Sequence, residues 1–130
     1  MHRVFVYGTL KSGGKIRGLD TLGWMHDIED AAELIGKAVT ANPSFSLYNL
    51  GAFPAASIKG NNKILGEVWE VNDEMFGLLD GIEGYPEFYN RTKVQTTQGE
   101  AWMYYIPGIE DDQDEELIYA APGEIVSWGS

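Results

Sequence analysis

The sequence predicts an α+β domain in which short strands outnumber helices. Short runs rich in β-branched and aromatic side chains recur along the chain and are separated by glycine and proline. One stretch near the middle instead repeats apolar residues at the helical period. No internal repeat and no low-complexity linker divides the 130 residues. We therefore expect a single domain over residues 1–130, with its sheet curled toward a barrel.

The first strand is predicted at residues 3–7, where Arg-Val-Phe-Val-Tyr follows the N-terminus almost at once. A glycine-rich segment, residues 8–14, comes directly after it. Backbone N–H groups that turn outward in such a segment can form a concave anion-binding site. The spacing to a Lys-Ser/Thr pair excludes a P-loop, and an ordinary strand-to-loop turn is the alternative to an anion site.

Further strands are predicted after an ambiguous region in the first third of the chain. Residues 17–30 are consistent with one or two helical turns broken by a glycine. Strands are expected at residues 33–40, with a glycine bulge, and at residues 45–48. Residues 49–56 contain glycine and proline and predict a tight connection. Residues 64–71, Ile-Leu-Gly-Glu-Val-Trp-Glu-Val, form the strongest strand pattern of the chain.

A helix is predicted directly after that strand. Four apolar residues at helical spacing form one stripe on its surface: Met75, Leu78, Leu79 and Ile82. Asn72 or Asp73 occupies the position where a helix needs an N-cap acceptor. The helix is expected to end near Glu83, because Gly84 can adopt the left-handed cap and Pro86 cannot continue the hydrogen-bond ladder.

The position of Glu83 is unusual for a carboxylate, because it lies in the last helical turn beside the apolar stripe. The negative end of the helix dipole and desolvation by apolar neighbours both raise the pKa of a carboxyl group. A raised pKa suits a residue that takes and returns protons, although a solvated surface glutamate is the other interpretation. Asp80 lies three residues earlier, and we expect it to be a helix-end or hydrogen-bonding residue rather than a partner in catalysis. A hydrolase using Asp80 and Glu83 is disfavoured, because this spacing is tight for two carboxylates that flank a bond.

The C-terminal part of the chain predicts a hairpin, an acidic loop and two short strands. Residues 91–97 and 101–106 are expected to pair across a Gln-Gly-Glu turn. Residues 110–116 carry six acidic side chains in seven positions and predict a solvated turn. A calcium site there is the alternative, but the ligand alternation and central glycine of an EF-hand loop are missing. Residues 118–119 and 125–128 are short closing segments.

Composition excludes several kinds of chemistry. The chain has no cysteine, which removes disulfides, thiolate nucleophiles and thiolate metal ligands. Its two histidines, His2 and His26, are too few for a Ser-His-Asp or multi-histidine zinc site unless carboxylates contribute. The formal net charge of −11 disfavours nucleic acid as a partner. The N-terminus has no long apolar run, so we expect no secretory signal, no membrane span and a cytoplasmic location.

Two motifs taken together are more informative than either alone. The first is Val-Phe-Val-Tyr-Gly-Thr-Leu-Lys at residues 4–11, and the second is Leu-Asp-Gly-Ile-Glu-Gly-Tyr-Pro at residues 79–86, followed by Tyr89 and Arg91. With these motifs the chain resembles the γ-glutamylcyclotransferase-like superfamily, in particular its γ-glutamylamine cyclotransferase (AIG2-like) branch. Three further segments are similar and occur in the same order: residues 48–55, 66–69 and 101–105.

The resemblance implies a small mixed β-barrel with one or two helices and a cavity at one end. The residues implied to hold the substrate's α-carboxylate through main-chain N–H groups are Tyr7, Gly8, Thr9 and Leu10. Glu83 corresponds to the family's catalytic glutamate. Tyr89 fits the place of a tyrosine that borders the pocket, and packing at the start of its strand is the alternative role.

The implied reaction converts a γ-glutamyl amine or γ-glutamyl amino acid to 5-oxoproline and a free amine. The substrate's own α-amine attacks its γ-carbonyl, so no metal or organic cofactor is required and the expected partner is the small γ-glutamyl substrate. Residues 13–30 have no clear counterpart in the resemblance, which leaves the identity of the leaving amine open. The oligomeric state is open as well. A non-catalytic protein of the same fold that binds a small acid or a partner protein is the alternative.

Overall fold

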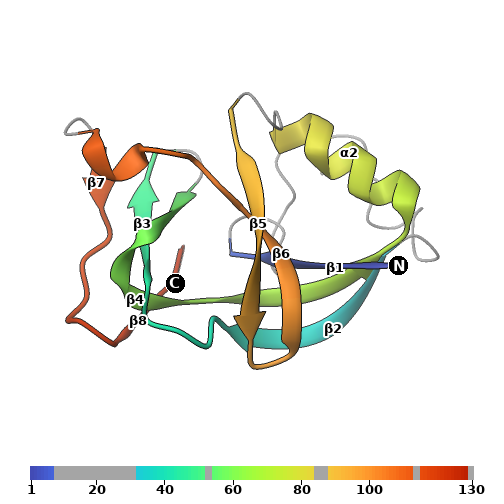
Figure 1. The fold of residues 1–130 in the computed structure, drawn as a ribbon, viewed down its shortest axis with the longest axis horizontal. Coiled ribbons are helices and arrows are strands. Elements are labelled where there is room, and N and C mark those ends of the chain that lie inside the picture. The colour runs from blue at the N-terminus through green and yellow to red at the C-terminus, as the bar shows by residue number, and fades with distance from the viewer. Residues whose placement is uncertain (8–31, 52–53, 84–87, 113–114, 129–130) are drawn as a thin grey trace.

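The computed structural model describes residues 1–7, 32–51, 54–83, 88–112 and 115–128. Within these ranges the chain forms a mixed β-sheet, with the helix α2 packed on one face of it (Figure 1). In chain order the elements are β1 (His2–Val6), β2 (Ala32–Val39), β3 (Phe45–Asn49), β4 (Pro54–Val71), α2 (Asp73–Glu83), β5 (Asn90–Thr96), β6 (Gly99–Tyr105), the 3-10 helix η2 (Ile109–Asp111), β7 (Glu116–Leu117) and β8 (Ile125–Val126). The α+β class predicted from the sequence is confirmed.

The described strands form an open sheet, so the predicted barrel is not confirmed. Their order is β5-β6-β1-β4-β3-β7, with β2 and β8 also paired to β4. The sheet is mixed because β1 is antiparallel to β4 and parallel to β6. An isolated bridge between Thr40 and Thr96 brings the end of β2 next to the end of β5. The sheet is therefore strongly curled at this corner without a closed ring of strand pairs.

Strand β4 is the longest element and organises the sheet. Its first half pairs with β3, and its second half pairs with β1 and β2. It begins at Pro54, ten residues before the predicted strand at residues 64–71, so the prediction of a tight connection over residues 49–56 was wrong in its second half. The reason is that Ala55 and Ala56 are fully buried opposite β3, where small side chains fill the space but give no strand pattern in the sequence.

The other elements predicted within the described residues are found close to their expected bounds. The helical turns expected at residues 17–30 lie outside the described residues. The N-cap of α2 is Asn72, whose side-chain oxygen accepts the N–H of Met75 at 2.8 Å. Strand β2 carries a register shift between Leu34 and Gly36, where the bulge was expected. Strands β5 and β6 form the predicted hairpin. The pairing of β7 lies at Glu116–Leu117, just before the expected residues 118–119.

Two apolar cores cover the two faces of the sheet, because successive residues of a strand point to opposite sides. In β1, Val4 and Val6 belong to the same buried core as Met75 and Leu79 of α2. The side chains of Phe5 and Tyr7 belong to the opposite core. The helix α2 therefore packs on the face of the sheet that carries Val4 and Val6 of β1. No helix within the described ranges has the length and apolar character that a membrane crossing requires.

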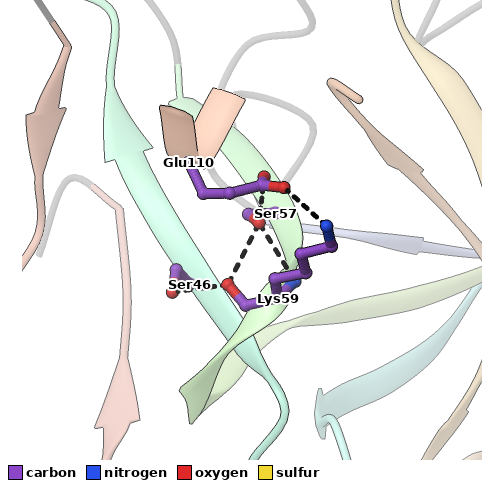
Figure 2. A network of polar contacts seen from close by, with 4 residues as sticks. All are labelled: Ser46, Ser57, Lys59 and Glu110. Carbon is purple, nitrogen blue, oxygen red and sulfur yellow. Dashed lines mark hydrogen bonds and ion pairs between the residues drawn. The ribbon is translucent and has the colours of Figure 1, made fainter. Parts of the chain in front are cut away.

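Part of the acidic segment is structured, which corrects the prediction of a solvated turn there. Glu110 lies on η2, and its side chain is only 17% exposed. The Ser57 hydroxyl donates to this carboxylate at 2.7 Å, and the Lys59 ammonium lies 3.7 Å from it. Figure 2 shows the two contacts. Ser46 also donates a hydrogen bond to the carbonyl of Lys59. The Ser57 hydrogen bond is the main cause that lowers the pKa of Glu110, so this carboxylate fastens η2 to the β3–β4 hairpin.

Candidate active site

The helix α2 and the strand β1 begin together and run in the same general direction (Figure 1). At their starts, the His2 ring contacts the carboxylate of Asp73 and lies 4.5 Å from the Phe76 ring. From there β1 extends about 17 Å to Tyr7 at roughly 3.3 Å per residue. The helix extends about 15 Å to Glu83 at 1.5 Å per residue. The last turn of α2 and the end of β1 therefore lie on the same side of the molecule.

The last turn of α2 is held by hydrogen bonds to Asp80. The Arg91 guanidinium on β5 donates to both carboxylate oxygens, at 2.9 and 3.3 Å. The Tyr104 hydroxyl on β6 donates to Oδ1 at 2.6 Å. All three side chains are partly or fully buried, so these charge-assisted bonds are stronger than their equivalents at the surface. The hydrogen-bonding role predicted for Asp80 is confirmed.

The guanidinium of Arg91 also contacts two aromatic rings. Its guanidinium carbon lies 4.4 Å from the centre of the Phe76 ring and 4.6 Å from that of Trp102. Such contacts add cation–π attraction and limit rotation of the planar group. The two rings come from α2 and β6, so Arg91 joins the helix to the β5–β6 hairpin. The sequence signal for this role was weak, because an arginine at the start of a strand is usually a surface residue.

Tyr104 connects the helix to the end of β1. Its side chain binds Asp80, and its backbone carbonyl accepts a hydrogen bond from the Tyr7 hydroxyl at 2.6 Å. The same Tyr7 oxygen accepts the N–H of Ala56 on β4 at 3.0 Å. Tyr7 is buried, so these bonds are shielded from water. They fix the point at which the chain leaves β1, immediately before Gly8.

The predicted site residues differ in what the structure describes of them. Gly8, Thr9 and Leu10 lie outside the described residues, and so does the side chain of Glu83, although its backbone closes α2. Tyr89 is 2% exposed and belongs to the core under α2. Its hydroxyl donates to the carbonyl of Pro54 at 2.7 Å. Packing at the start of β5 is therefore observed for Tyr89, and its contact with substrate stays a prediction.

A second carboxylate is buried on the helix-facing side of the sheet. Glu67 on β4 is 4% exposed and accepts a hydrogen bond from the Trp69 indole N–H at 3.3 Å. It pairs across the ladder with Val6, close to the end of β1. The sequence did indicate this buried glutamate, because Glu67 lies within the strongest apolar strand pattern. A glutamate in such a strand must either face solvent or have hydrogen-bond partners inside the protein. Within the described ranges, no three His, Asp or Glu side chains come together as a metal site.

These contacts define a class of small α+β domain in which Tyr104 links the last turn of one helix to the end of the first strand. The solved structure of an AIG2-like protein from Mus musculus has this fold, with a TM-score of 0.67, 28% identity, and coverage of 82% of this chain and 78% of that one. The solution structure of protein YtfP from Escherichia coli has it as well, with a TM-score of 0.64, 31% identity and 94% coverage of both chains.

The sequence comparisons place the chain more closely. The family described as γ-glutamyl cyclotransferase, AIG2-like, matches residues 4–124. The γ-glutamylcyclotransferase family protein YtfP of Escherichia coli is 35% identical over 104 residues, which cover 78% of this chain and 80% of that protein. The protein therefore belongs to the AIG2-like γ-glutamylcyclotransferase family, as the two sequence motifs predicted.

Proposed function

We propose that this protein converts a γ-glutamyl amine or a γ-glutamyl amino acid to 5-oxoproline and a free amine. Its family supports the reaction class. The observation that carries the assignment of a site is the pair of hydrogen bonds by which Tyr104 joins Asp80 to Tyr7. These bonds connect the helical turn that contains Glu83 with the strand end that precedes Gly8.

The reaction is an intramolecular acyl transfer. The α-amine nitrogen forms a bond to the γ-carbonyl carbon, and the bond from that carbon to the leaving nitrogen breaks. An ammonium group has no free electron pair, so its proton must be removed before attack, and the leaving nitrogen must gain a proton before it departs. We assign both transfers to Glu83, because one carboxylate placed between the two nitrogens can take a proton and return it.

The remaining proposed residues bind and orient the substrate. Main-chain N–H groups of Tyr7, Gly8, Thr9 and Leu10 hold the α-carboxylate, which fixes the chain in a conformation close to the ring. Such restraint is worth several kcal/mol in an intramolecular reaction. Tyr89 borders the pocket. The leaving amine or amino acid is not assigned.

The first prediction is that Glu83→Gln abolishes turnover and leaves the fold intact. The amide has nearly the shape of the carboxyl group but cannot accept the ammonium proton, so the proton-transfer contribution, roughly 10²-fold or more, is lost. The measurement is the release of 5-oxoproline from a panel of γ-glutamyl amines, γ-glutamyl amino acids and glutathione. Glu74→Gln is the matched control, because Glu74 is an exposed glutamate in the first turn of the same helix.

Two outcomes would contradict the proposal. Release of 5-oxoproline by Glu83→Gln at the parent rate would remove Glu83 from the mechanism. Binding of γ-glutamyl compounds in calorimetry, without product from any member of the panel, would instead indicate a non-catalytic protein that binds small acids.

A further inference from the structure

Tyr104 holds both ends of the candidate site through different groups. Its hydroxyl donates to Asp80 at 2.6 Å, and its carbonyl accepts from Tyr7 at 2.6 Å. Tyr104 is buried, and its strand β6 is paired with β1 on one side and β5 on the other. Tyr104 pairs with Arg91 of β5, and its neighbour Met103 pairs with Phe5 of β1. The hydroxyl therefore ties the helix to a rigid part of the sheet.

Arg91 adds a cation that the helix sequence lacks. The last turn of α2 contains no basic residue, although a helix C-terminus favours positive charge. Arg91 supplies that charge from β5 and makes a two-pronged contact with Asp80. The rings of Phe76 and Trp102 contact the guanidinium and limit its rotation. Lysine could match the charge at this place but not the paired hydrogen bonds.

We propose that Asp80, Arg91 and Tyr104 form a positioning network that sets where the last turn of α2 lies relative to the end of β1. This inference rests on the proposed function of Glu83, three residues after Asp80 in the same turn. None of the three residues needs to touch substrate. They act through the helix backbone, and misplacement of a reacting group by about 1 Å can cost roughly a hundredfold in rate.

The sharpest test is Tyr104→Phe, which removes the hydroxyl and keeps the ring in the core. We expect kcat for 5-oxoproline release to fall by about tenfold to a hundredfold, with KM largely unchanged, because the substrate-binding groups remain. Tyr105→Phe is the matched control. Tyr105 is the next residue of β6, and its side chain packs against the opposite core, so its kcat should equal that of the parent protein.

Asp80→Asn and Arg91→Lys provide independent variants of the same network. Each is expected to lower kcat as Tyr104→Phe does, and lysine should not rescue the site despite its charge. Combining Asp80→Asn with Tyr104→Phe should lower kcat little further than Asp80→Asn alone, because residues that share one network are not additive. Full additivity of the two losses would overturn the proposal of a shared network.

A second readout separates this inference from the proposed function. Amide chemical shifts in NMR should change at residues 80–83 and at Tyr7 in Tyr104→Phe. In Tyr105→Phe the shifts of residues 80–83 should stay unchanged, because Tyr105 packs against the opposite core. Unchanged shifts at these positions would overturn the positioning network, whether or not the protein is active. The positioning network would also be overturned if Tyr104→Phe had the kcat of the parent protein while Glu83→Gln was inactive. If the parent protein releases no 5-oxoproline, the proposed function fails, and the amide shifts still decide the positioning claim.

Discussion

At the residue scale, Tyr7 contributes to the fold through a side chain that the sequence motif does not explain. The resemblance assigns Tyr7 a backbone role in substrate binding. The structure adds that its ring lies in the core opposite α2. Its hydroxyl bridges the carbonyl of Tyr104 and the N–H of Ala56. A tyrosine is thus required here for stability, independently of any contact its backbone makes with a ligand.

Tyr7→Phe is therefore expected to lower the free energy of unfolding by about 1–3 kcal/mol, because it leaves two buried backbone groups without this hydrogen bond. Urea denaturation followed by circular dichroism measures the change. Tyr119→Phe is the matched control, since Tyr119 is 80% exposed and its loss of a hydroxyl should leave stability unaltered. Equal midpoints for Tyr7→Phe and the parent protein would show that the buried hydroxyl contributes nothing.

At the element scale, Gly66 allows β1 to lie close to β4. A Cβ atom at this position would be 2.2 Å from the carbonyl oxygen of Val6 and 2.9 Å from the Phe5 ring. Backbone atoms of a paired strand cannot move aside without breaking the ladder. We expect Gly66→Ala to destabilise the protein by about 1–3 kcal/mol, as overpacking of a core does, and to displace the end of β1 that carries Tyr7. Thermal unfolding measures the first effect.

The opposite sign is expected for the same substitution in α2. Gly77 is exposed, and a Cβ atom there would meet nothing within 4 Å. Alanine restricts the unfolded chain and favours the helix, so Gly77→Ala should raise the free energy of unfolding by about 0.5–1 kcal/mol. If Gly66→Ala were as stable as Gly77→Ala, the close approach of β1 and β4 would not be a constraint on this sequence.

The sequence predicted secondary-structure elements well where large apolar residues recur at a regular period. It predicted them poorly where the buried residues are small. The stripe of α2 and its Asn72 cap were recognisable, because both follow from local spacing. The start of β4 was not, because Ala55 and Ala56 are buried for their small size, which only the facing strand β3 explains. Long-range pairing of this kind leaves no local pattern.

At the scale of the whole molecule, the candidate site is also only partly predictable. The motifs predict that Tyr7 and Glu83 belong to one site, although they are far apart in the chain, and this stays a prediction. They did not identify Arg91 and Tyr104 as the residues that bind Asp80, because that contact depends on how β5 and β6 lie beside α2. Local sequence motifs thus predict the reacting residue, whereas tertiary packing decides which residues bind Asp80.

The acidic character of the molecule makes its stability depend on pH, and Glu110 gives this dependence a local origin. The chain has a formal net charge of −11, so repulsion between its negative charges opposes the compact state. Glu110 differs from exposed carboxylates, because its hydrogen bond with Ser57, helped by Lys59, lowers its pKa in the folded state. A lowered folded-state pKa means that the ionised form stabilises the fold.

The difference in unfolding free energy between the parent protein and Glu110→Gln isolates this contribution from the other carboxylates. It should be fully present above the ordinary glutamate pKa of about 4.3. It should then decrease as the pH falls through the lowered pKa of the folded state, because protonation removes the charge that Ser57 and Lys59 stabilise. Urea titrations of both proteins from pH 7 to acid measure it. A difference that stays constant with pH would mean that the carboxylate in Figure 2 holds η2 by its shape rather than by its charge.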